Sequence, residues 1–195
     1  TISGNTIGST STANSINAST AATSSTTQVV TGISNTGSGT HTISSNTIAN
    51  LNNAYDPSTA NTNSIIRGIF SSQGANTING NTVRNLSTAA NATGATSSVS
   101  VAGIINTSTT GNLTISQNSI HSLSNTNTSA LTQIIGIYNT GPATGVNTIS
   151  RNFIHSLKLS TSAVGIIYGL YNNAGSITNA NNMIRLGIDE TGTSL

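Results

Sequence analysis

The sequence contains no cysteine and no tryptophan, and only two of its 195 residues are proline. Without cysteine, the protein has neither disulfides nor a cysteine-based metal site. It also lacks any run of about 18 apolar residues, the length that a membrane-spanning helix needs. We therefore expect no membrane insertion.

Charge is nearly as scarce as cysteine. Charged residues make up 4% of the chain, whereas ordinary domains carry about 25%. Five basic and three acidic residues give a formal net charge of +2. Nucleic-acid binding requires clustered Lys and Arg that neutralise several phosphates. The five basic residues are instead spread from Arg67 to Arg185, so we expect no nucleic-acid partner.

The residues that fill the chain are small and polar. Ser and Thr together number 65, one third of the chain, and there are 28 Asn. Such a bias first suggests disorder. However, isoleucine recurs at regular positions, and disordered chains lack a spaced set of β-branched apolar residues. The pattern therefore indicates a folded repeat protein.

Two motifs alternate along the chain. The first reads T-I-x-x-N-x-I-x-x-L and occurs as HTISSNTIANL (41–51), NTINGNTVRNL (76–86), LTISQNSIHSL (113–123) and NTISRNFIHSL (147–157). The second reads I-I-x-G-I-x-N and occurs, for example, as IIRGIFSSQG (65–74) and IIGIYNTG (134–141). Variation in length lies almost wholly in the loops between them.

These motifs are typical of strands and turns, because short apolar pairs rich in Ile, Val and Thr are punctuated by Asn and Gly. A short strand buries its apolar residues only when copies stack about 4.8 Å above and below it as a parallel sheet. We predict an all-β fold, a β-solenoid of about five turns with three short strands per turn and variable loops. It forms a single domain, 1–195, with repeat units of roughly 1–40, 41–75, 76–111, 112–146 and 147–176 and a degraded terminal turn at 177–195.

The core is predicted to consist of ladders of like residues. Four ladders are expected: Ile43, Ile78, Ile115 and Ile149; Ile48, Val83, Ile120 and Ile154; Leu51, Leu86, Leu123 and Leu157; and Ile33, Ile69, Ile104, Ile137 and Leu170. Glycines recur inside the second motif, where glycine marks a bend or a close backbone approach. We expect Gly32, Gly68, Gly103, Gly136 and Gly169 to let each turn change direction.

One asparagine recurs at a corner of each turn. Asparagine suits tight corners, and stacked Asn side chains can hydrogen-bond along the stack. The predicted structural asparagine ladder consists of Asn5, Asn46, Asn81, Asn118 and Asn152. A second, weaker ladder is expected from Asn35, Asn106, Asn139 and Asn172.

With these N-x-I repeats and asparagine columns, nearly the whole chain resembles the right-handed parallel β-helix of the pectin-lyase-like class. The resemblance implies the same hand, and enzymes of that class use clustered acidic residues to hold calcium or to carry out acid/base hydrolysis. This chain departs from the pattern, because its acids are only Asp56, Asp189 and Glu190. Asp56 is expected about 19 Å from the other two, whereas glycosidase carboxylates lie about 5–9.5 Å apart. We predict no catalytic residues, no metal, no cofactor and no enzymatic activity.

Two outward columns could contact a partner. The first, Arg84, His121, His155 and Arg185, is either an anion or acidic-glycan contact strip or an ordinary solvated row. His121 and His155 are expected about 4.8 Å apart, but no carboxylate or thiolate joins them and two cationic neighbours oppose a metal. The second column, Phe70, Tyr138 and Tyr171, is an aromatic stripe. It could stack on sugar rings or on another solenoid, or it could be covered by the long loops.

Three functions compete on this evidence. The first is a non-enzymatic structural module of a secreted or cell-surface bacterial protein. Its Asn/Thr/Ser/Gly-rich units look similar to those of large surface-exposed β-helix proteins. Such a module would be a rigid shaft, adhesin stalk or filament subunit, joined end to end to copies of itself or to further turns of its parent protein. The alternative is a carbohydrate-binding module that contacts glycans or cell-surface polymers through the aromatic and basic columns. Ice binding ranks lowest, because the threonines concentrate in irregular loops and next to inward Ile.

Overall fold

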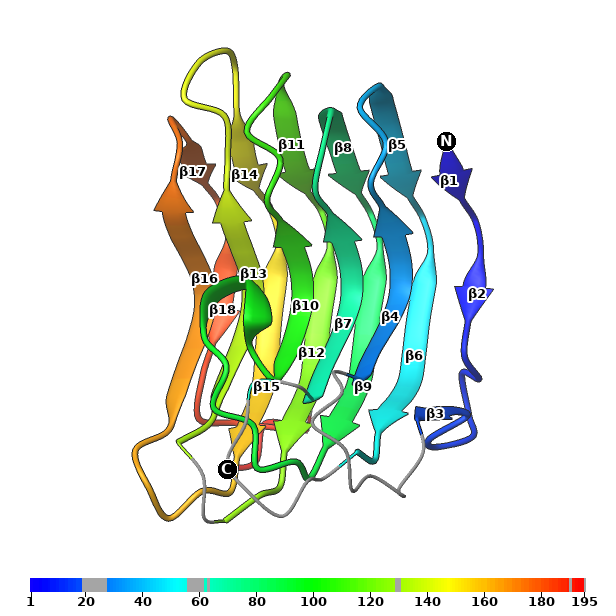
Figure 1. Cartoon of the computed structure of the whole chain (residues 1–195), viewed down its shortest axis with the longest axis vertical. Helices are drawn as coiled ribbons and strands as arrows, with labels where there is room; N and C mark the ends of the chain where they lie inside the picture. Colours follow the sequence, from blue (N-terminus) through cyan, green and yellow to red (C-terminus); the bar gives the residue numbers. More distant parts are fainter. Residues whose placement is uncertain (19–27, 56–61, 63, 129–130, 190, 195) are drawn as a thin grey trace.

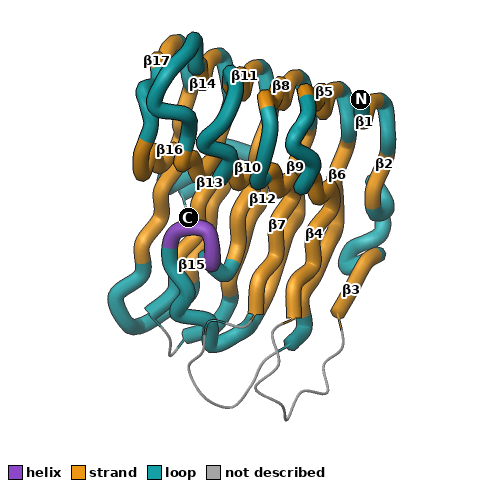
Figure 2. Tube along the Cα trace, turned by 45° about the horizontal axis from the view of Figure 1, so that its top comes forward, coloured by secondary structure: helices purple, strands orange, loops and turns teal. Residues whose placement is uncertain are grey.

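The computed structural model describes residues 1–18, 28–55, 62, 64–128, 131–189 and 191–194. The chain is an all-β parallel β-solenoid, which confirms the predicted fold class. Its described helical content is a single short 3₁₀ helix, η1 (Thr96–Ser98). Strands from successive turns lie side by side, and Figure 2 shows them stacked as repeated rungs.

The strands form three parallel sheets, which we name A, B and C. Sheet A holds β1 (Ile2–Ser3), β5 (Thr40–Ser44), β8 (Ala75–Asn79), β11 (Leu113–Ser116), β14 (Thr148–Ser150) and β17 (Thr178–Ala180). Sheet B holds β2 (Thr6–Ile7), β3 (Ile16–Ala18), β6 (Thr47–Asn53), β9 (Thr82–Thr88), β12 (Ser119–Asn125), β15 (Phe153–Leu159) and β18 (Met183–Arg185). Sheet C holds β4 (Gln28–Asn35), β7 (Ser64–Ser71), β10 (Val101–Asn106), β13 (Gln133–Thr140) and β16 (Ile166–Ala174).

The solenoid has about four turns rather than the predicted five. Each full turn runs from sheet A through B to C, and the four turns between β5 and β16 carry all three strands at full length. The first predicted unit falls short because eight residues, 8–15, separate Ile7 from Ile16. Only two residues separate the paired Ile48 and Leu51 of the next turn. This insertion splits the strand into the short β2 and β3, which both pair with β6.

The register of the strands confirms the predicted apolar ladders. Ile43 pairs with Ile78, and Ile115 pairs with both Ile78 and Ile149. All four side chains are fully buried, as are their counterparts facing them from sheet B. The Leu51 ladder and the Ile33 ladder are likewise in register through every full turn. These ladders form one continuous core inside the solenoid.

The glycine column serves close packing rather than a left-handed backbone. A Cβ on Gly103 would lie 2.5 Å from the Gly136 carbonyl oxygen and 2.5 Å from Cγ2 of Ile120. The equivalent atom on Gly68 would lie 2.3 Å from a methyl of Val83. Sheet C therefore approaches the Ile48 ladder of sheet B so closely that only glycine fits. The prediction that these glycines redirect the chain missed this reason.

The corner between sheets A and B does require a left-handed residue. Ser45, Gln117 and Arg151 lie there with φ of 56°, 56° and 57°, and Gly80 occupies the same corner with φ of 62°. Non-glycine residues pay for this conformation in steric strain. Each of these residues immediately precedes an asparagine of the predicted ladder, so the corner aims the asparagine side chain inward.

Candidate functional site

The five asparagines of the predicted ladder are linked from turn to turn by side-chain hydrogen bonds. The Oδ1 atom of Asn118 accepts bonds from the backbone N and from Nδ2 of Asn81, at 3.0 and 2.9 Å. Its Nδ2 donates to Oδ1 of Asn152 and to the carbonyl oxygen of Ile78, both at 2.9 Å. The same pattern repeats from Asn46 to Asn152, and the four are 1% exposed, so the ladder satisfies buried polar groups.

The ladder has a sixth member that the sequence prediction did not include. Asn182 accepts from the N and Nδ2 of Asn152, at 3.0 and 2.9 Å, and donates to the carbonyl oxygen of Ile149. Each asparagine from Asn5 to Asn152 donates to the asparagine of the following turn through the same atoms. The ladder therefore has a direction, with an acceptor, Oδ1 of Asn5, at its first rung and donors at its last rung.

The second predicted asparagine ladder is less regular. Asn106 donates to Oδ1 of Asn139 at 3.0 Å, whereas Asn35 donates to the hydroxyl of Ser71, which occupies the column in that turn. Nδ2 of Asn139 and Oδ1 of Asn172 are buried without a partner among the described residues. The register shifts between Asn139 and Thr140, and this irregularity coincides with the break in the ladder.

The structure places the predicted basic column in one row of sheet B. Arg84, His121, His155 and Arg185 follow one another in register. The rings of His121 and His155 stack with centroids 4.7 Å apart and planes 5° apart, close to the expected rung spacing. The Phe153 ring also stacks on the His155 ring, with the two centroids 4.4 Å apart. His155 is only 9% exposed, so its imidazole offers little surface to a partner.

Arg84, at one end of that row, is bound to a segment outside the repeat. Nη2 of Arg84 donates to the carbonyl oxygen of Thr10 at 2.7 Å, which ties the inserted segment 8–15 to sheet B. Among the described residues, no group of three or more His, Cys, Asp or Glu side chains is placed to hold a metal ion. Of the three acids, Asp56 and Glu190 lie outside the described residues, and Asp189 lies in the groove described below.

The predicted aromatic stripe lies on the outer face of sheet C, but a loop covers part of it. Tyr138 is 4% exposed and belongs to a second apolar cluster with Val99, Ala102, Ile105 and Ile135. The segment that carries η1 supplies Val99, and Figure 1 shows it crossing in front of sheet C. Of the two outcomes left open for this stripe, burial under a loop therefore holds for Tyr138.

The remaining aromatic rings border this cluster. Phe70, Tyr168 and Tyr171 are half-buried against it. Tyr168 stacks on Tyr171 with centroids 4.7 Å apart. The guanidinium of Arg67 lies 4.5 Å from the Phe70 ring centroid and donates to the carbonyl oxygen of Ser97, which anchors the loop. Burial lowers the pKa of Arg67 below its usual value. The stripe thus acts mainly as packing for a loop.

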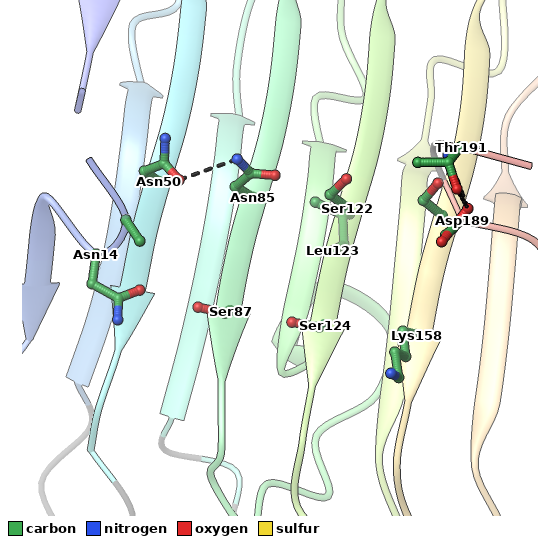
Figure 3. A pocket seen from close by; sticks show the side chains of 12 residues that line it. Asn14, Asn50, Asn85, Ser87, Ser122, Leu123, Ser124, Lys158, Asp189 and Thr191 are labelled. Atoms are coloured by element: carbon green, nitrogen blue, oxygen red, sulfur yellow. Dashed lines mark hydrogen bonds between the residues drawn. The ribbon is translucent and has the colours of Figure 1, made fainter. Parts of the chain in front are cut away.

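A groove of about 530 Å³ lies along sheet B (Figure 3). Its floor is a column of left-handed residues with φ between 55° and 58°: Asn50, Asn85, Ser122 and Ser156. Nδ2 of Asn85 donates to Oδ1 of Asn50 at 3.1 Å. Beside this column lie Ser87, Ser124 and Lys158, which are aligned by the strand register. Eight of the twelve residues that line the groove therefore carry an amide or a hydroxyl group.

Two non-repeating segments close the ends of the groove. Ala13 and Asn14 line one end, and Asp189 and Thr191 line the other. Oδ1 of Asp189 accepts hydrogen bonds from the Thr191 hydroxyl and from the backbone N of Thr191 and Thr193, at 2.7, 2.9 and 2.8 Å. These bonds, the Thr191 side chain foremost, lower the pKa of the Asp189 carboxyl below its usual value.

Sequence reasoning missed this groove, because repeats alone do not show where the segments outside them fold. The one available signal is the extra length of 8–15 between Ile7 and Ile16. No helix in the described part of the chain is long and apolar enough to cross a membrane.

The fold and its ladders define the chain as a parallel β-solenoid repeat protein. No family model, curated protein or solved structure matches the chain significantly.

Proposed function

We propose that the chain is a non-enzymatic structural module that acts as a rigid shaft in a secreted or cell-surface protein, in a bacterium. In this role it serves as an adhesin stalk or filament segment and is extended by further rungs. Those rungs come from its parent protein or from a second copy stacked end to end. The observation that carries the proposal is the directional asparagine ladder, which links all turns through the same atoms.

The two terminal rungs support this role through their shape and chemistry. Solenoid stability comes largely from contacts between neighbouring repeats. The first rung leaves Ile16 40% exposed, and the last leaves Met183 59% and Ile184 42% exposed. An added rung would cover these apolar residues and continue the strand pairing. At such a junction, the amide of Asn182 would donate to Oδ1 of Asn5, as each ladder member does to the next.

Stacking between copies is tested by measuring the lengths of the particles that the purified chain forms. We expect rods of multiple length in negative-stain images and a concentration-dependent sedimentation coefficient. Ile184→Lys should abolish both, because it places a charge in the junction. Val146→Lys is the matched control, because Val146 is 77% exposed on the loop between β13 and β14. A chain that stays monomeric at all concentrations contradicts stacking between copies.

The shaft role has its own test. Duplicating the unit 76–111 should give a folded chain with one more turn, because each unit pairs only with its neighbours. We expect a larger β-sheet circular dichroism signal and an unchanged or higher melting temperature. A lengthened chain that fails to fold would contradict extension by simple addition of rungs.

Carbohydrate binding is the second candidate function. For this function the groove on sheet B is a better site than the aromatic stripe, part of which a loop covers. Amides and hydroxyls repeat along the groove at the rung spacing of about 4.8 Å, and polar groups that fix orientation are typical of ligand sites. Ser124→Arg would fill the groove, and Ser150→Arg, on sheet A, adds the same charge elsewhere. Glycan-array binding that Ser124→Arg abolishes and Ser150→Arg preserves would support this function, and equal binding by both would exclude the groove.

A further inference from the structure

Sheet A presents an unbroken column of threonines on its outer face. Strand pairing places Thr42 beside Thr77, Thr77 beside Thr114, and Thr114 beside Thr148. Thr178 continues the column beside Thr148. Each threonine precedes the position of the buried Ile43 ladder, and side chains alternate between the two faces of a strand, so all five point outward. Figure 1 shows the strands that carry them in a row at the top of the view.

A second small polar column runs parallel to the first, two residues further along each strand. Its members are Ser3, Ser44, Asn79, Ser116, Ser150 and, at the last rung, Ala180. Rungs repeat at about 4.8 Å, and alternate residues of a parallel strand lie about 6.6 Å apart. The outer face is therefore a two-column lattice of small, mostly hydroxyl-bearing side chains.

The hydroxyls of the threonine column are available to water. In the described part of the chain, none of the five threonine hydroxyls has a protein hydrogen-bond partner; four of the five residues are half-buried and one is exposed. The most exposed is Thr178. The six strands of sheet A contain no Asp, Glu, Lys or Arg, and the exposed Arg151 lies just beyond the end of β14.

The lattice has a rigid base. The Ile43, Ile78, Ile115 and Ile149 side chains directly behind it are 0% exposed. The buried asparagine ladder fixes the corner where sheet A ends. Threonine is β-branched and has a restricted χ1, so each hydroxyl and methyl holds a defined position in a strand.

The strand register removes the objection that the sequence raised against ice binding. A threonine next to an inward isoleucine counts in favour of a regular array, because alternation turns it to the outer face in every turn. Water molecules in ice occupy regularly spaced positions, and the lattice offers hydroxyl groups at two regular spacings. Ordered waters bridging protein hydroxyls are enthalpically nearly as good as direct hydrogen bonds.

We propose that the outer face of sheet A binds ice. Waters held between the threonine hydroxyls take positions that continue the lattice of a growing crystal, and the threonine methyls fill the spaces between them. The adsorbed protein then stops the crystal from advancing at that point. This activity goes beyond the structural role and needs only a single copy of the chain.

The experiment measures thermal hysteresis and ice-crystal shape with the purified chain. We expect a gap between melting and freezing points, with faceted crystals. Thr114→Lys, in the middle of the column, should abolish most of the gap. Thr82→Lys should leave it unchanged. Thr82 is a half-buried threonine of β9 in sheet B, like Thr114 in exposure class, and it pairs with Thr47 and Ser119 away from the array.

Thr114→Val provides a second variant that keeps the β-branched shape and removes only the hydroxyl, should the lysine disturb the fold. It should reduce the gap while the circular dichroism spectrum stays that of the unsubstituted chain. Absence of hysteresis and of crystal shaping at the highest soluble concentration overturns the proposal. An equal effect of Thr114→Lys and Thr82→Lys overturns it too. Neither result bears on the shaft role, which the rod-length measurement tests.

Discussion

Replacing Asn118 with alanine should destabilise the protein more than any comparable change on its surface. The substitution removes four hydrogen bonds, two accepted from Asn81 and two donated, to Ile78 and Asn152. The side chain is 1% exposed, so water cannot replace them. At about 1 kcal/mol for each bond, the free energy of unfolding should fall by about 4 kcal/mol. The total free energy of unfolding of a domain is only about 5–15 kcal/mol.

Asn5→Ala is the matched control at the end of the same column. Its side chain makes two hydrogen bonds, and the residue is exposed, so water replaces them and the loss should stay below about 1 kcal/mol. Urea denaturation followed by circular dichroism measures both variants. With a slope of roughly 2–3 kcal/mol per molar urea, the midpoint of Asn118→Ala should fall by roughly 1.5 M. Equal midpoints for the two variants would refute the argument that the ladder stabilises the interior of the solenoid.

Three further outcomes follow from the backbone and from one carboxyl group. Gly103→Ala should cost about 1–3 kcal/mol in denaturation experiments, because its Cβ would lie 2.5 Å from two atoms, whereas Gly39→Ala, with no atom closer than 3.9 Å, should cost little. Gln117→Gly should raise the free energy of unfolding by about 1 kcal/mol, because glycine adopts the left-handed corner without strain. The reverse change at the same corner of another turn, Gly80→Gln, should lower it by a similar amount. A change of the same sign in both variants would show that left-handed backbone strain does not decide stability at this corner. The pKa of Asp189 is lowered, so its turn is stabilised above the usual carboxyl pKa and loosens as pH falls through the lowered value. Amide NMR signals of Thr191 and Thr193 should report this, and Asp189→Asn should remove the dependence.

The sequence predicted the parts of the molecule that repeat. Stacking copies of one motif left Ile43, Ile78 and their counterparts only one way to be buried, and the strand register confirms those ladders. The glycine column was found as a column, but its physical reason needed the distance from sheet C to the Ile48 ladder. A sequence pattern predicts which residues share a face, but it does not predict how closely two sheets approach each other.

The parts that do not repeat could not be predicted in the same way. The loop that buries Tyr138 carries Val99 and η1 in one turn only, so no neighbouring copy indicates its path. The groove depends on the inserted segment 8–15 and on Asp189 and Thr191, which lie over sheet B outside the repeat. The turn count was one too high because an interrupted copy, with Ile7 and Ile16 in separate strands, reads like a whole one in sequence.

The stacking of rungs also determines how the protein would respond to a pulling force. Hydrogen bonds between parallel strands of successive turns point along the solenoid axis, so axial tension passes through every junction in series. β12 has six registered pairs with β9, whereas β17 and β18 have three each, with β14 and β15, and the described residues of that last turn add no strand to sheet C. The last rung would part first, at a load that the junctions between the core turns still withstand. In a longer shaft, strength under tension would depend on its most sparsely paired junction rather than on the number of turns.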